Sequence, residues 1–335
     1  MVDIFIQSFG TTFLSMLKIL FVVLLAGFLL RRNIVTQENL RGLSVTTIDV
    51  FLPCLSFTSI LTHFRPGEFA IWWVLPIAGI LITTIGMLLG WLFFYRELPE
   101  KRNMIPLASI QNAAYLILPL GAVLFPQQFE QFSVYVFLFV MGQSIPIWTI
   151  GKQLTTSGAD TDFRWKDMVT PPMVATLLAI TCVSLGLHSL FIPEGVQRGG
   201  IINTFFPTIF GAMQLIGTAT PPLAIFILGG VLGSITLRFR SYLFDAIRVL
   251  AIKFVLLPLL TLLTVLFFSI GETNPLLAIF FVIESSSAPA IAIALQVKKY
   301  GGDEQKIGSI LVLTYLACLV MLPFWIATWT LVAPT

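Results

Sequence analysis

Residues 275–297 read PLLAIFFVIESSSAPAIAIALQV, an apolar stretch that is interrupted at its centre by Glu284, three serines and Pro289. Proline and small polar residues inside a membrane helix free backbone N–H and C=O groups that lipid cannot satisfy. A break of this kind therefore persists only where protein buries it or where it lines a cavity.

Residues 105–125 carry a second break, in which Gln111 and Asn112 precede Pro119. Paired interruptions in corresponding segments of two halves are typical of a binding site near the membrane midplane of a secondary transporter. The alternative is two independent proline kinks, since proline is common in membrane helices.

The composition of the chain places it in a membrane. Its 335 residues are 57% hydrophobic and 10% charged, whereas soluble domains are about one-quarter charged. Ten apolar stretches approach the roughly 20 residues that cross a bilayer. They are residues 11–30, 43–61, 70–95, 105–125, 132–151, 171–192, 205–232, 246–270, 275–297 and 307–332. The sequence predicts an all-α membrane protein with ten transmembrane helices.

Basic residues alternate between the predicted loops. Three Lys or Arg follow each odd-numbered span, which accounts for fifteen of the 19 in the chain. The positive-inside rule then places these loops in the cytoplasm and both termini outside, in a multi-pass protein of the plasma membrane. The net charge of +3 arises in these loops, where it meets anionic lipid of the bilayer, and it does not indicate nucleic acid.

Two halves follow from this topology. We predict a first five-helix repeat at 1–152, a cytoplasmic linker at 153–170 and a second repeat at 171–335. Because five is odd, the second repeat enters the membrane from the opposite face. The broken helices 4 and 9 then enter from opposite faces and can meet, which predicts two inverted repeats with broken crossover helices.

Glu284 is the sharpest candidate for chemistry. It lies about nine residues inside its span, where a carboxylate is costly unless it is paired, protonated or hydrated. We hypothesise that Glu284 couples transport to an ion by binding a proton together with the substrate, because burial disfavours its charged form. The alternative is a structural ion pair or hydrogen bond that locks two helices.

The serine-rich segment offers an anion site. Serine is a favoured N-cap and proline suits the first helical position, so a second half-helix is expected to begin at Pro289. Its free N–H groups would bind a carboxylate, which makes Ser286, Ser287, Ala288 and Pro289 candidate substrate-binding residues. Alternatively, the serines hydrogen-bond back to their own helix and bend it.

Amides complete the candidate site. Gln111 and Asn112 can both donate and accept hydrogen bonds, which suits a carboxylate or hydroxyl ligand, although amides also hold helices together. Gln143 marks a lesser break in the fifth span, and Gln214 another in the seventh. Both are interpreted mainly as packing or support, and Gln143 is retained as a substrate-binding candidate.

Other polar residues have simpler interpretations. Asp49 lies roughly six residues inside the second span and is a second ion-coupling candidate. Lys18 is a candidate partner for Asp49 or Glu284. Lys253 follows Arg248 by about one turn and is expected to snorkel to the cytoplasmic face.

Two further sequence features concern packing and the outer surface. His63 and His188 are expected near the outer surface. The segments GMLLG at 86–90 and GGVLG at 229–233 permit close approach of neighbouring helices.

Enzyme signatures are missing from the sequence. It contains no HExxH, GxSxG or P-loop pattern and no cluster of Cys or His with metal-ligand spacing. Its three cysteines all lie within predicted spans and form no disulfide pattern. We therefore predict no enzymatic activity, no cofactor and no metal.

Two motifs resemble the auxin efflux carrier family. NAAYLILPL at 112–120 is similar to the Asn…Leu-Pro motif in the fourth helix of that family. ESSSAPA at 284–290 and KYGGD at 299–303, followed by Leu322 and Pro323, resemble its ninth and tenth helices. The agreement in topology extends along nearly the whole chain, and the short central loop resembles bacterial permeases more than plant auxin carriers.

This resemblance implies a mechanism. It implies that helices 4 and 9 cross at their prolines, which places Asn112, Pro119 and the segment Ser287, Ala288 and Pro289 at the carboxylate end of the substrate. It implies substrates that are small organic anions, such as auxin, malate or malonate. It further implies that helices 1, 2, 6 and 7 form a scaffold that makes a homodimer, while the others move as an elevator.

The sequence thus predicts a secondary carrier of a small organic anion, coupled to H⁺ or uncoupled. A Na⁺-coupled symporter of the bile-acid type, with Glu284 and Gln111 in a Na⁺ site, is one alternative. A membrane sensor that does not transport is another.

Overall fold

The computed structural model describes residues 2–67, 69, 71–98, 100–155, 168–192, 201–235, 238, 240–300 and 303–333. Within these residues the chain contains helices and no strand, and one isolated antiparallel bridge joins Gln111 to Pro289. The all-α prediction is confirmed for this part of the chain.

The helices have the following bounds. In the first half they are α1 Val2–Arg31, α2 Gln37–Thr46, η1 Thr47–Phe51, α3 Leu52–His63, α4 Val74–Phe94, η2 Tyr95–Glu97, α5 Met104–Ser109, α6 Ile117–Leu124, α7 Phe129–Pro146, η3 Ile147–Gly151 and α8 Lys152–Thr155. In the second half they are α10 Pro171–Ser184, α11 His188–Phe191, α12 Ile201–Thr218, α13 Thr220–Gly233, η4 Arg240–Tyr242, α14 Leu243–Ala251, η5 Ile252–Leu256, α15 Leu257–Phe267, α16 Ile270–Thr273, α17 Pro275–Ser285, α18 Ala292–Tyr300 and α19 Glu304–Val332.

Seven helical stretches among the described residues are long and apolar enough to cross a membrane. They are Val2–Arg31, Gln37–His63, Val74–Glu97, Phe129–Thr155, Thr204–Gly233, Leu243–Phe267 and Glu304–Val332. These coincide with seven of the ten predicted spans. The predicted spans 105–125, 171–192 and 275–297 each contain two shorter helices instead. Of the predicted linker at 153–170, residues 156–167 lie outside the described part.

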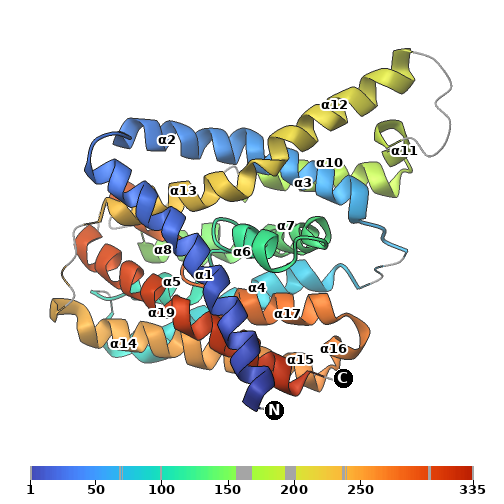
Figure 1. The fold of residues 1–335 in the computed structure, drawn as a ribbon. Coiled ribbons are helices and arrows are strands. Elements are labelled where there is room, and N and C mark those ends of the chain that lie inside the picture. Colours follow the sequence, from blue (N-terminus) through green and yellow to red (C-terminus); the bar gives the residue numbers. More distant parts are fainter. Residues whose placement is uncertain are drawn as a thin grey trace.

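The helices form two groups in space. In Figure 1, α2, α3, α10, α12 and α13 lie along the top and α14, α15, α17 and α19 along the bottom, with α6 and α7 between them. α3 packs mainly against α10 and α12, whereas α4 packs against α5 and α7. We call the first group the outer layer, and α4–α8 together with α14–α19 the core bundle.

Helix α1 lies across both groups and packs against α13 and α19 (Figure 1). The two ends of the chain lie at the same end of the molecule, where Ser8 Oγ and Thr330 Oγ1 are 2.8 Å apart. The termini therefore face the same side, and their predicted outside location stays a prediction.

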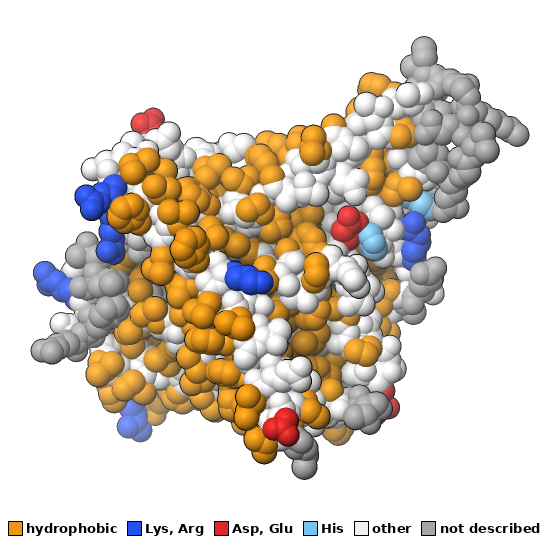
Figure 2. Space-filling model, in the orientation of Figure 1, with side chains coloured by type: hydrophobic (Ala, Val, Ile, Leu, Met, Phe, Trp, Pro, Cys, Tyr) orange, Lys and Arg blue, Asp and Glu red, His pale blue; other side chains and the backbone are white. Residues whose placement is uncertain are grey.

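Charged side chains gather at the ends of the helices. Figure 2 shows an apolar band across the molecule, with most of the visible Lys and Arg at the end where α1 stops and α14 begins. At that end Asp245 binds Lys101 at 2.8 Å and Lys306 at 2.6 Å, and Glu97 pairs with Lys101 and Arg248. This network joins the ends of α4, α14 and α19.

Glycines bring two pairs of helices into backbone contact. A Cβ atom on Gly229 of α13 would lie 2.4 Å from the carbonyl oxygen of Val23 in α1, and one on Gly86 of α4 would lie 2.9 Å from Cβ of Ser109 in α5. Both expected glycine segments, 86–90 and 229–233, thus permit close approach of neighbouring helices.

Replacing Gly229 with Ala should force α1 and α13 apart and destabilise the protein by about 1–3 kcal/mol. Thermal unfolding of purified protein in detergent measures this. Gly10→Ala, on a helix position with nothing within 4 Å of the added Cβ, is the matched control and should not lower the melting temperature. Equal melting temperatures for the two variants would contradict the close contact.

Candidate functional site

The two predicted breaks meet in the middle of the molecule. Asn112 N–H donates to Ala288 O at 3.0 Å, and Ala290 N–H donates to Ile110 O at 3.1 Å, on either side of the Gln111–Pro289 bridge. The two unwound segments thus form one short antiparallel pair that connects α5 and α6 with α17 and α18. Each break satisfies backbone groups of the other, which is what a buried interruption requires.

Pro289 suits this pair because of its register. The residues opposite each other, Gln111 and Pro289, exchange no hydrogen bond of their own, since the bonds are made by their neighbours. A proline, which has no N–H, is tolerated at such a position. The pairing keeps residues 288–290 extended, so the expectation that a half-helix begins at Pro289 is wrong. That helix, α18, begins at Ala292.

Pro119 lies outside the break. It is buried in the first turn of α6, which spans Ile117–Leu124, where its missing N–H would have no helical partner in any case. The break in this segment runs over residues 110–116, and the structure places Pro119 in a packing position rather than in the pair.

Gln111 is the centre of a buried amide cluster. Its Oε1 accepts from Gln143 Nε2 at 2.9 Å and from Thr83 Oγ1 at 3.3 Å, and Gln143 also donates to the Gln111 carbonyl at 3.3 Å. Gln111 is 1% exposed, and its Nε2 has no hydrogen-bond partner among the described residues. The structure therefore brings Gln111 and Gln143 together and leaves one amide donor free.

Asn112 contacts a residue that the sequence did not single out. Its Nδ2 donates to the hydroxyl of Tyr315 in α19 at 2.5 Å, and that hydroxyl donates to Pro289 O at 2.9 Å. Tyr315 thus bridges the two breaks. No local signal marks it, because it lies inside a continuous apolar helix, without a break or a charge nearby in sequence.

The serines use their hydroxyl protons locally. Ser285 and Ser286 donate to Val282 O at 3.1 and 2.7 Å, and Ser287 donates to Glu284 O at 2.9 Å. This is the back-bonding that the sequence left open as an alternative. The hydroxyl oxygens still have lone pairs, and all three residues, like Ala288, are 0% exposed.

Two buried ionisable side chains, Glu284 and Lys253, lack a hydrogen-bond partner among the described residues. Glu284 and Lys253 are each 0% exposed, and neither the carboxylate nor Nζ forms a hydrogen bond within the described part of the chain. They interact electrostatically with each other. The expectation that Lys253 snorkels to the surface is wrong, because α4, α5 and α19 pack around η5.

Asp49 and Lys18 lie apart from this cluster. Both are exposed, Asp49 on η1 and Lys18 on α1, and the described ion pairs include neither of them. The pairs considered for Lys18 are therefore not formed, and the ion-coupling role of Asp49 stays a prediction.

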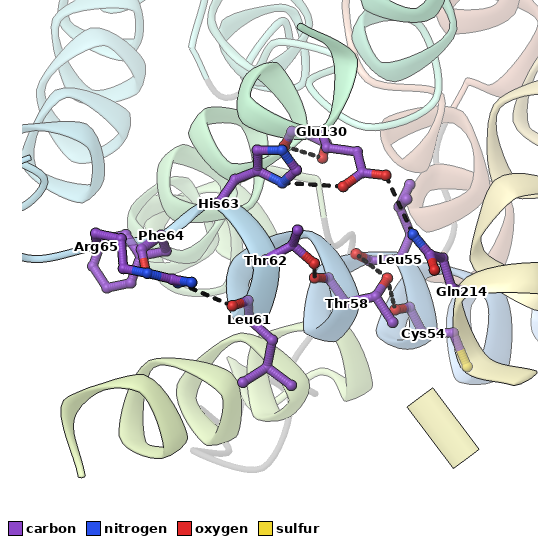
Figure 3. Close-up of polar contacts among 11 residues, drawn as sticks. Cys54, Leu55, Thr58, Leu61, Thr62, His63, Phe64, Arg65, Glu130 and Gln214 are labelled. Carbon is purple, nitrogen blue, oxygen red and sulfur yellow. Dashed lines mark hydrogen bonds and ion pairs between the residues drawn. The ribbon is translucent and has the colours of Figure 1, made fainter. Parts of the chain in front are cut away.

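A separate polar cluster joins the outer layer to the core bundle. In Figure 3 the His63 ring and the Gln214 amide both point toward the carboxylate of Glu130. His63 Nδ1 lies 3.0 Å from Glu130 Oε2, and Gln214 Nε2 donates to Oε1 at 3.5 Å. His63 and Gln214 belong to α3 and α12, and Glu130 to α7. The described residues contain no group of three or more acidic, His or Cys side chains that could hold a metal ion.

The chain matches a known family over most of its length. Residues 11–163 and 160–326 match the family model described as membrane transport protein. No curated protein matches the chain.

The hydroxyl of Tyr315 is expected to stabilise the crossing. Tyr315→Phe removes one bond from each break and should cost about 1–3 kcal/mol, because it leaves Pro289 O and Asn112 Nδ2 buried without a partner. Thermal unfolding checks the loss. Tyr242→Phe, at a half-buried tyrosine with no hydrogen bond among the described residues, should unfold as the unmodified protein does. Equal losses in both variants would mean that the bridge does not contribute.

Proposed function

The chain belongs to the auxin efflux carrier-like family of membrane transport proteins, and from that premise we propose that it is a secondary active carrier of a small organic anion. The cargo is a mono- or dicarboxylate of the size of malate, malonate or auxin. The family consists of transporters rather than enzymes, in agreement with the lack of enzyme signatures in the sequence.

The crossing of the two breaks is the observation that carries this proposal. It combines unwound backbone, buried amides and a free donor at Gln111 Nε2 in the middle of apolar helices. Donors of this kind bind carboxylate oxygens. Gln111 and Asn112 belong to the first break, and Tyr315 joins Asn112 to Pro289 of the second, so a ligand that binds these side chains would lie at both breaks. Ser286, Ser287, Ala288 and Pro289 line the second break as binding candidates.

The proposed architecture is ten spans in two inverted five-helix repeats, residues 1–152 and 171–335. Two matched interruptions, α5–α6 and α17–α18, support the repeat. The outer layer would be the static scaffold and the homodimer interface in the plasma membrane. The core bundle, which carries the crossing, would move across the membrane as an elevator.

Coupling to H⁺ is proposed to occur at Glu284, whose buried carboxylate has no hydrogen-bond partner among the described residues. In the alternative of a Na⁺-coupled symporter, the same carboxylate would bind Na⁺. Uptake into proteoliposomes with a pH gradient or a Na⁺ gradient separates the two, since only the ion that is coupled drives accumulation.

Malate, malonate and auxin should each be tested for a thermal shift, and at least one is expected to raise the melting temperature of the protein. Asn112→Ala should abolish that shift and the uptake of the same anion, because it removes the amide that joins Tyr315 to the first break. Asn274→Ala is the matched control. It removes a helix cap at the other end of α17 and costs about 1 kcal/mol, but should keep the ligand shift.

Binding of an anion to the protein without any uptake into proteoliposomes would favour the alternative that the protein is a membrane sensor that does not transport. An undiminished shift in Asn112→Ala would place the site elsewhere.

Alternating access predicts that a link between the two groups of helices stops transport. With the native cysteines replaced, a bifunctional thiol reagent across His63→Cys and Glu130→Cys should block uptake, because it joins α3 to α7. The control pair is Ser56→Cys and Thr176→Cys, whose hydroxyls lie 2.6 Å apart within the outer layer. Cross-linking the control should leave uptake intact, and full uptake by the first pair after complete cross-linking would contradict the elevator.

A further inference from the structure

Lys253 has a position that neither packing nor an ion pair explains. It lies in the π-helical turn η5 and is wholly buried. Its Nζ has no hydrogen-bond partner among the described residues, and the carboxylate of Glu284 is equally unpartnered. The two groups interact electrostatically without a direct ion pair.

The local backbone fixes η5 in this place. Pro258 has no N–H, so the carbonyl of Phe254, four residues earlier, is left without its helical donor. Trp325 Nε1 of α19 donates to that carbonyl at 2.7 Å. The bond ties the turn that carries Lys253 to α19.

Helix α19 also reaches the second break. Cys318 Sγ lies 3.9 Å from Ser286 O, and α19 also packs against η5, the turn that carries Lys253. Tyr315, one turn earlier, contacts Asn112 and Pro289 O. Helix α19 therefore connects the turn that carries Lys253 with the residues of the proposed substrate site.

Other titratable groups on the elements around η5 and α17 already have an ion-pair or hydrogen-bond partner, are exposed, or are uncharged. Asp245 pairs with Lys101 and Lys306, Arg248 with Glu97, and Glu130 with His63. The hydroxyl of Tyr135 binds Asn274, and Glu272 and Glu304 are exposed. The remaining groups, Tyr315 and Cys318, are uncharged in their ordinary protonation state near neutral pH. Among the described residues, Glu284 is thus the group that can balance the charge of Lys253.

A single unbalanced charge in a buried site is costly, whereas a balanced pair is tolerated. A carboxylate group of the substrate that enters beside Lys253 and Glu284 would add one negative charge to this balanced pair. Neutrality is restored when a proton binds the Glu284 carboxylate and the ammonium of Lys253 becomes the partner of the anion. No metal ion is required for this exchange.

Resting on the proposed function, we propose that Lys253 is the cationic partner of the substrate carboxylate. In the free protein the ammonium of Lys253 balances the Glu284 carboxylate, and when the anion binds, Glu284 takes up a proton and Lys253 balances the anion instead. Binding of one carboxylate group therefore takes up one proton from solution. The affinity for the anion falls as the pH rises, by up to about tenfold per pH unit, because the bound state holds more protons than the free state.

The test uses malonate, malate and auxin as probes on the purified full chain. Calorimetry in buffers of different ionisation enthalpy counts the protons taken up per bound anion. For the unmodified protein we expect close to one proton, and for Glu284→Gln we expect none, with an affinity that no longer depends on pH. Lys253→Met should lose anion binding by at least tenfold.

The double variant Lys253→Met/Glu284→Gln separates binding from folding. Its melting temperature should exceed that of Lys253→Met, because neither buried charge is left alone, yet it should not bind the anion. Lys18→Met, at an exposed lysine of α1, is the matched control and should bind and take up protons as the unmodified protein does.

Anion binding by the unmodified protein without proton uptake would overturn this inference and leave the proposed carrier function standing. Tight binding by the double variant would overturn it as well. Failure of every probe to bind the unmodified protein would overturn the proposed function, and this inference with it.

Discussion

The backbone of an interrupted membrane helix must find hydrogen-bond partners inside the protein, and that constraint organises this molecule. Neither break can exist alone in the apolar interior, because unpaired N–H and C=O groups in an apolar environment are costly. The structure resolves this by pairing the two breaks with each other at Gln111 and Pro289. Two carbonyls are not bonded within the pair. Tyr315 donates to the carbonyl of Pro289, and Gln143 donates to the carbonyl of Gln111. The crossing is consequently a fixed arrangement, with side chains from three helices, α4, α7 and α19, converging on it.

Once the backbone is satisfied, the side chains decide what the site can bind. Three of the buried groups that have no hydrogen-bond partner among the described residues are a donor amide at Gln111, an ammonium at Lys253 and a carboxylate at Glu284. Two of these three favour an anion, and the third opposes one unless it is neutralised. This imbalance supports the proposed anion site with proton uptake over a Na⁺ site, because Na⁺ beside Lys253 would meet a like charge.

The sequence predicts the breaks well and the details of the site poorly, for a physical reason. Proline and polar residues in an apolar stretch are local signals, so both breaks and seven long helices could be located. The start of α18 could not, because it depends on pairing between residues 111 and 289, which are distant in sequence. Tyr315 carries no local signal at all. The spacing of Lys253 to Arg248 predicts a place at the surface, but α4, α5 and α19 bury this lysine. Spacing along one helix contains no information about which other helices pack against it.

Packing within and between the two groups of helices differs in kind. Inside the core bundle, α7 is interlocked with α4, where a Cβ on Gly142 would lie 1.8 Å from Pro76 O. Helix α1 is held to α13 in the same way through Gly229, but it meets α19 through surface contacts such as Phe5 with Phe324. Backbone interlocking resists sliding, whereas side-chain contacts can be exchanged for others. Helix α1 therefore belongs mechanically to the outer layer. In the proposed elevator, the two groups would slide past each other between α1 and α19 and between α3 and α7, where the polar contact of His63 with Glu130 lies.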